Sequence, residues 1–148
     1  MEITLRRATI EDIPSILEVE KGVVGTKVYS GLTGAEDATQ EINENVYFVI
    51  EKDGKGVGDV SYQIQGEDKA YVNGLAVAVE FQRQGIARQA MKMMLEMLKD
   101  YKTVYLMTHP ENIRAINLYE SLGFKKTGEI YENYYNDGEP RIKMILEK

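Results

Sequence analysis

The segment EFQRQGIARQA, residues 80–90, joins an apolar stretch that ends at Val79 to a stretch with helical periodicity. From Ile86 onward apolar residues recur every fourth position, with charged residues on the opposite face. The first turn of such a helix has backbone N–H groups without intrahelical partners and the positive end of the helix dipole. Gly85 permits close approach of a ligand, and Ala87 keeps the next exposed position small. The segment therefore predicts an anion-binding turn; the alternative is a plain strand-to-helix turn in which Gly85 only relieves a clash.

The composition limits the class of protein. The chain has 148 residues, no cysteine and a single histidine, so disulfides, an acyl-cysteine intermediate and a multi-histidine metal site are excluded. A formal charge of −6 disfavours nucleic acid and favours a cationic partner, although it is also an ordinary solubility feature. No apolar run reaches the ~18–20 residues of a membrane span, and residues 1–10 lack the apolar part of a secretory signal. We therefore expect a cytoplasmic protein without a membrane partner.

Hydrophobic periodicity predicts one α/β domain over residues 1–148, with a mixed sheet covered by about four helices. The expected strands cover residues 3–5, 46–50, 57–64, 69–79, 103–108, 124–135 and 141–148, and the expected helices cover residues 9–20, 86–98 and 112–122, with a short helix within residues 21–45. Asn112 is expected to cap its helix. Residues 21–45 are the least predictable part of the chain and a candidate for a lid.

Two motifs carry a resemblance to a known family. QRQGIA, residues 82–87, matches the pattern Gln/Arg-x-x-Gly-x-Gly/Ala, with which GNAT acetyltransferases wrap the pyrophosphate of acetyl-CoA. NIRAINLYESLGF, residues 112–124, matches a second signature of that family, Asn-x-x-Ala-Ile-x-Leu-Tyr-x-x-x-Gly-Phe, at every specified position. The chain thus resembles the GNAT superfamily, and its C-terminal half resembles the bacterial ribosomal-protein alanine acetyltransferases.

The resemblance implies a GNAT-like, mostly antiparallel sheet with splayed central strands, and acetyl-CoA as the acetyl donor without a metal. In the family, the strand before the pyrophosphate turn pairs with the pantetheine arm of the donor. Gly74 in mid-strand supports a bulge or a close backbone approach there; the alternative is a local bend without a ligand. The residues that the resemblance assigns to acetyl-CoA binding are Leu75, Ala76, Val77, Gln82, Arg83, Gln84, Gly85, Ile86, Ala87, Asn112 and Tyr119.

The same resemblance implies N-acetylation of a primary amine, either a small amine or a peptide or protein N-terminus, by direct attack in a ternary complex. Tyr119 matches the tyrosine proposed to protonate the leaving thiolate, although an isolated helical tyrosine would simply pack in the core. Met107 occupies the position of a glutamate in the alanine acetyltransferases, and methionine cannot accept a proton. Tyr71 matches a strand tyrosine of the eukaryotic N-terminal acetyltransferases and is the first candidate for the base. His109 precedes a proline at a strand end and is expected to be a loop residue.

Aromatic and acidic residues are candidates for the acceptor cleft, because both carboxylates and aromatic faces attract ammonium groups. These candidates are Tyr29, Tyr131, Tyr134, Tyr135, Glu132, Asp137 and Glu139. The alternative is a hairpin whose tyrosines only pack across strands. The competing function is a non-catalytic acyl-CoA-binding sensor or regulatory module, which the methionine at position 107 favours and an intact Tyr119 opposes. Homodimers are common in the superfamily, but no feature of the sequence identifies an interface.

Overall fold

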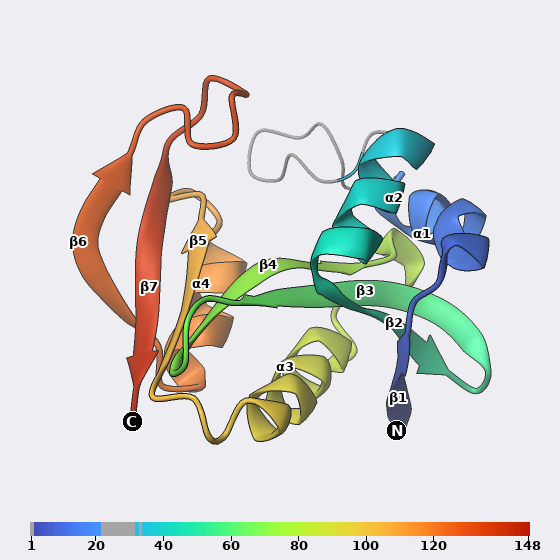
Figure 1. Cartoon of the computed structure of the whole chain (residues 1–148), viewed down its shortest axis with the longest axis horizontal. Coiled ribbons are helices and arrows are strands. Elements are labelled where there is room, and N and C mark those ends of the chain that lie inside the picture. Colours follow the sequence, from blue (N-terminus) through green and yellow to red (C-terminus); the bar gives the residue numbers. More distant parts are fainter. Residues whose placement is uncertain (1, 22–31, 33) are drawn as a thin grey trace.

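The computed structural model describes residues 2–21, 32 and 34–148, and within them seven strands form one sheet in the order β1-β2-β3-β4-β5-β7-β6 (Figure 1). The strands are β1 (Ile3–Arg7), β2 (Val46–Lys52), β3 (Lys55–Ile64), β4 (Lys69–Val77), β5 (Thr103–Thr108), β6 (Lys125–Tyr131) and β7 (Arg141–Glu147). Neighbouring strands are antiparallel except for the parallel pair β4 and β5. The predicted α/β class and mostly antiparallel sheet are confirmed.

Four α-helices accompany the sheet in the described ranges, together with two short 3-10 helices, η1 and η2. They are η1 (Ile10–Asp12), α1 (Ile13–Glu20), α2 (Ala35–Glu44), η2 (Val79–Phe81), α3 (Ile86–Met97) and α4 (Ile113–Ser121). Figure 1 shows α1 and α2 on one side of β2–β4 and α3 on the other. None of these helices is long and apolar enough to cross a membrane. The lid predicted within residues 21–45 falls largely on 22–31 and 33, which lie outside the described residues.

The helix α3 has the predicted amphipathic pattern. Ile86, Ala90, Met94 and Leu98 are all at most 1% exposed and belong to the main core against the sheet. Burial of each large apolar side chain contributes about 1.5–3 kcal/mol. This packing holds the N-terminus of α3 rigidly at the end of β4. The strand β4 ends at Val77 and not at Val79 as expected, because the chain turns away from the sheet through η2 to reach α3.

The central strands separate halfway along β4. Parallel pairs join Lys69–Val72 of β4 to Thr103–Leu106 of β5, and no later residue of β4 pairs with β5. A register shift against β3 leaves Asn73 as an extra residue next to Gly74, so the bulge expected at this point is present. Within the described ranges, the remaining residues of β4 pair with β3 alone. The splay thus leaves a free strand edge just before the turn into α3.

Gly58 lies where β3 and β4 leave no room for a side chain. A Cβ at this position would lie 2.4 Å from the carbonyl oxygen of Ala76 and 3.3 Å from the Cα of Val77. Because both atoms belong to the backbone, Gly58→Ala must displace β4, and we expect it to lower the free energy of unfolding by about 3 kcal/mol. Gly56→Ala is the control, since its Cβ would meet only a side-chain methyl of Val49 at 3.4 Å. Equal midpoints in chemical denaturation for the two variants would contradict this prediction.

Candidate active site

A cavity of about 910 Å³ lies along the splay between β4 and β5, and this volume is within the usual range of small-molecule sites. One part of its wall consists of β4, the turn into α3, β5, α4 and two residues of the β6–β7 side, Tyr135 and Arg141. The other part comes from α1, α2, β2 and β3. The predicted acetyl-CoA residues that line it are Leu75, Ala76, Val77, Gln82, Arg83, Gly85, Ile86, Ala87, Asn112 and Tyr119. The structure therefore brings together all of that predicted set except Gln84.

The turn into α3 is open toward a ligand. Gly85 is the N-cap residue, with φ +80° and ψ 9°, and Arg83 also has a left-handed φ of +66°. Among the described residues, no side chain caps this helix end, and a Cβ on Gly85 would meet no atom of them within 4 Å. The backbone N–H groups of the first helical turn, the positive end of the dipole and the Arg83 guanidinium are the donor set that a diphosphate requires. The residues present thus fit the pyrophosphate of acetyl-CoA.

The two glutamines of the motif hold the turn in place. The Nε2 of Gln82 donates a hydrogen bond to the carbonyl oxygen of Val77 at 3.0 Å, which ties the turn to the end of β4. The Oε1 of Gln84 accepts a hydrogen bond from the Nζ of Lys52 at 3.1 Å. Since the Gln84 side chain is directed to β2, any contact of this residue with the donor has to come from its backbone.

Two residues of the second motif lie in the cavity wall. The Oδ1 of Asn112 accepts a hydrogen bond from the backbone N–H of Ala115 at 3.3 Å, so the predicted helix cap is present. Tyr119 is 9% exposed and packs edge-on against Phe124. Burial, with a smaller effect of Tyr135, raises the pKa of Tyr119 to about 12. The phenol is therefore protonated at neutral pH and can donate a hydrogen bond into the cavity.

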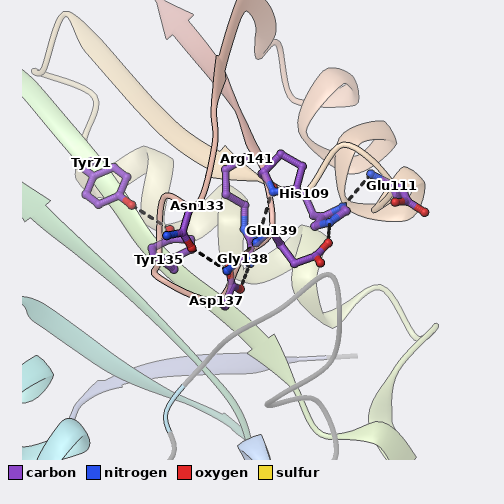
Figure 2. A network of polar contacts seen from close by, with 10 residues as sticks. Tyr71, His109, Glu111, Asn133, Tyr135, Asp137, Gly138, Glu139 and Arg141 are labelled. Carbon is purple, nitrogen blue, oxygen red and sulfur yellow. Dashed lines mark hydrogen bonds and ion pairs between the residues drawn. The ribbon is translucent and has the colours of Figure 1, made fainter.

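Tyr71, the candidate base, lies outside the cavity wall. Its ring stacks on Tyr105 with 4.9 Å between centroids, and its hydroxyl lies 3.0 Å from the hydroxyl of Tyr135 (Figure 2). Burial and the nearby Tyr135 hydroxyl raise the pKa of Tyr71 well above its ordinary value. A phenol in this state is a poor proton acceptor. Tyr135, and not Tyr71, reaches the cavity.

The loop between β6 and β7 is held by a polar network that Figure 2 shows. Buried Arg141 binds the Oδ2 of Asp137 at 2.9 Å through Nη2, and its guanidinium lies 5.1 Å from the centroid of the Tyr135 ring. The Nδ1 of His109 accepts a hydrogen bond from the backbone N–H of Glu111 at 3.0 Å, so its Nε2 carries the proton and donates to Glu139 at 2.8 Å. These contacts tie the loop to the connection between β5 and α4.

The structure places the predicted histidine and the predicted acceptor-cleft residues differently relative to the cavity. His109 lies in the loop after β5, as expected, and is fully buried away from the cavity wall. Of the predicted acceptor-cleft residues that the structure describes, Tyr135 alone lines the cavity. Those outside the wall are Tyr131, Tyr134, Glu132, Asp137 and Glu139. Tyr29 lies outside the described residues.

An acidic part of the wall was not predicted. Glu20 and Asp59 are 1% and 2% exposed, and both line the cavity with Asp37 and Glu41 of α2 and with Tyr47. Within the described ranges, no group of three or more acidic or histidine side chains is arranged to hold a metal ion. One signal was present in the sequence, because Asp59 is a charged residue between Val57 and Val60 in the middle of a strand.

Comparison with known proteins identifies the family. Residues 16–124 match the model of the acetyltransferase (GNAT) family. An N-alpha-acetyltransferase of Sulfurisphaera tokodaii is 28% identical over 97% of this chain and 92% of its own length. A spermidine N(1)-acetyltransferase of Escherichia coli is 31% identical over 67% of this chain and 56% of its own length. The structure of the ribosomal-protein-S18-alanine N-acetyltransferase of E. coli has a TM-score of 0.80 at 27% identity, with 99% of this chain and 94% of that chain covered.

This chain belongs to the GNAT acetyltransferase family. It is an acetyl-CoA-dependent N-acetyltransferase, as the two sequence motifs predicted, and the non-catalytic sensor is not favoured.

Proposed function

We propose that this N-acetyltransferase acetylates the α-amino group of peptides or proteins, with acetyl-CoA and the acceptor bound in the cavity at the same time. The observation that carries the proposal is one continuous cavity that joins the open turn at Gly85 to a wall of carboxylates. The similarity to an N-alpha-acetyltransferase extends over 97% of this chain and 92% of that protein, which supports an N-terminal amine as the acceptor.

When bound, acetyl-CoA supplies a thioester whose acetyl group an amine can take. The open turn with Arg83 and Gly85 would hold its diphosphate. The free edge of β4 at Leu75–Val77 would pair with the amide groups of its pantetheine arm, because no strand occupies that edge in the described part of the chain. Asn112 keeps the N-terminus of α4 in place beside this arm.

Tyr119 is assigned to stabilise the departing sulfur. A thiol has a pKa near ~8.5, so complete proton transfer from a phenol of pKa about 12 is uphill by roughly 5 kcal/mol. We therefore infer that Tyr119 donates a hydrogen bond and passes on a proton that comes from the acceptor nitrogen, without itself becoming a phenolate. Tyr71 and Arg141 act as positioning residues, since both contact Tyr135 in the cavity wall.

A polyamine is the second candidate acceptor. The acidic wall, with Glu20, Asp37, Glu41 and Asp59, offers more negative charge than a single ammonium group needs. The similarity to a spermidine N(1)-acetyltransferase supports the same class of acceptor, but the matched region covers 56% of that protein.

The test is release of free CoA thiol from acetyl-CoA with a panel of acceptors, followed by product masses. We expect peptides with a free α-amine to be acetylated at least tenfold more efficiently than spermidine. The same peptides with an acetylated N-terminus are the control and are expected to be inactive, even where they contain lysine. A preference for spermidine would select the second candidate, and the absence of amine-dependent release would overturn the proposed function.

A further inference from the structure

Two buried carboxyl groups meet in the acceptor side of the cavity. Glu20 is the last residue of α1, and its Oε1 accepts a hydrogen bond from the backbone N–H of Leu32 at 2.9 Å. The Asp59 carboxyl interacts with the Glu20 carboxyl and with the Tyr47 hydroxyl. Burial and the Glu20 charge raise the pKa of Asp59 well above its usual value of 3.8. Two ionised carboxylates in contact are costly, so Asp59 holds its proton when no cation is present.

The pair lies beside the strand segment assigned to acetyl-CoA. Asp59 is directly opposite Ala76 of β4 and Val49 of β2 in the sheet register. Directly opposite residues share a sheet face, with Cβ atoms about 4.5–5.5 Å apart. Val49 packs with Ile16 of α1, so this face is the one that α1 and α2 cover. The Asp59 carboxyl is therefore one strand away from the free edge of β4, and both line the same cavity.

The wall at this point contains hydrogen-bond acceptors that lack donors. The Oδ2 of Asp59 and the Oδ1 of Asn73 are buried and have no hydrogen-bond partner among the described residues, and both residues line the cavity. An unsatisfied buried polar atom costs about 1–3 kcal/mol, so a ligand that brings donors is favoured. An ammonium group brings three N–H donors and a positive charge.

The charged and titratable groups around the pair are predominantly acidic or neutral. Asp37 and Glu41 come from α2, Tyr47 comes from β2, and Tyr135 and Arg141 come from the β6–β7 side. Arg141 is cationic, but it is bound to Asp137. The remaining arginines in the cavity wall, Arg83, Arg88 and Arg114, belong to the turn before α3, to α3 and to α4.

We propose that Glu20 and Asp59 form the subsite that binds the acceptor as an ammonium ion and takes its proton. This inference rests on the proposed function, and it supplies the proton acceptor that Met107 cannot provide. The ammonium nitrogen gives one proton to the carboxylate pair and becomes neutral. The nitrogen then attacks the thioester carbonyl carbon; the C–N bond forms and the C–S bond breaks. A second proton leaves the nitrogen and reaches the sulfur by way of Tyr119, and the pair returns its proton to solvent.

The test compares Asp59→Asn, Glu20→Gln and the double variant with the wild type in kcat/KM for an acceptor peptide, from pH 6 to 10 at saturating acetyl-CoA. At pH 7 the kcat/KM of each variant is expected to be at least 100-fold lower than that of the wild type. The loss should shrink above pH 8, because an α-amine with a pKa of about 7.7–8.0 is then neutral in solution. Glu18→Gln, on the exposed face of the same helix, is the matched control and should stay within twofold of the wild type.

Two further measurements separate this role from a structural one. Acetyl-CoA affinity, measured by calorimetry, should be unchanged in all variants. In the wild type, the folded state holds the Asp59 proton more tightly than the unfolded state, so this group's contribution to stability falls as pH rises from about 3.8 to its raised pKa. Asp59→Asn lacks this dependence, and its Tm relative to the wild type should therefore increase with pH over that range. The double variant removes both charges and is expected to fold at least as well.

Variants that keep more than a third of wild-type kcat/KM with an unchanged pH profile would overturn the subsite. If no amine is acetylated by the wild type, the proposed function itself fails. If the wild type is active and the variants retain its kcat/KM and pH profile, the proposed function stands, and only the role of Glu20 and Asp59 is overturned.

Discussion

Gly85→Glu is expected to abolish binding of acetyl-CoA, with a dissociation constant at least 100-fold weaker than that of the wild type. The turn at Gly85 is open, and no side chain in the described part of the chain caps the N-terminus of α3. A glutamate there places a carboxylate where the diphosphate binds, so two anions compete for the same N–H groups and the same helix dipole. At φ +80° a side chain also adds conformational strain of about 1 kcal/mol. Isothermal calorimetry with acetyl-CoA measures the loss directly.

Gly85→Ala separates charge from strain, because alanine imposes the same backbone penalty without an anion. We expect this variant to lose no more than tenfold in acetyl-CoA affinity. The glutamate variant should be at least as thermally stable as the alanine variant, since an acidic residue at a helix N-terminus is itself favourable. Affinity within tenfold of the wild type for the glutamate variant would mean that the anion site lies elsewhere.

The features that the sequence predicted well depend on local patterns. The amphipathic period of α3, the cap at Asn112 and the bulge beside Gly74 each follow from residues close together in the chain. Helix periodicity and capping are properties of a few neighbouring positions, so no knowledge of the tertiary fold was needed.

The features that were missed depend on contacts between distant elements. Glu20 reads as the end of an amphipathic helix and Asp59 as a polar residue in a strand, and only the packing of α1 on β3 makes them a pair. The tyrosines of the C-terminal hairpin were equivalent candidates in the sequence. The loop network then orients Tyr135 into the cavity and leaves Tyr131 and Tyr134 outside it. Side-chain direction in a loop is set by such partners and not by residue type.

Tyr119→Phe is expected to lower kcat at least 100-fold and to leave the affinity for acetyl-CoA within twofold of the wild type. General acid catalysis typically contributes 10²–10⁴-fold, which sets the scale of the loss. Phenylalanine keeps the volume of the ring and its edge-on packing against Phe124, so only the hydroxyl is removed. Steady-state kinetics at saturating acetyl-CoA, with calorimetry for affinity, measure both quantities.

Tyr101→Phe is the matched control, because Tyr101 packs against the same core but lies outside the cavity wall. Its kcat should equal that of the wild type, and wild-type turnover in Tyr119→Phe would contradict the assignment.

The pH profile gives a further distinction. With its pKa raised to about 12, Tyr119 stays protonated from pH 6 to 10. Removal of its hydroxyl should therefore lower kcat by the same factor at every pH in this range, without a change in the shape of the pH profile. Removal of the proton-accepting pair should change the shape itself, and the two roles therefore have separate kinetic signatures.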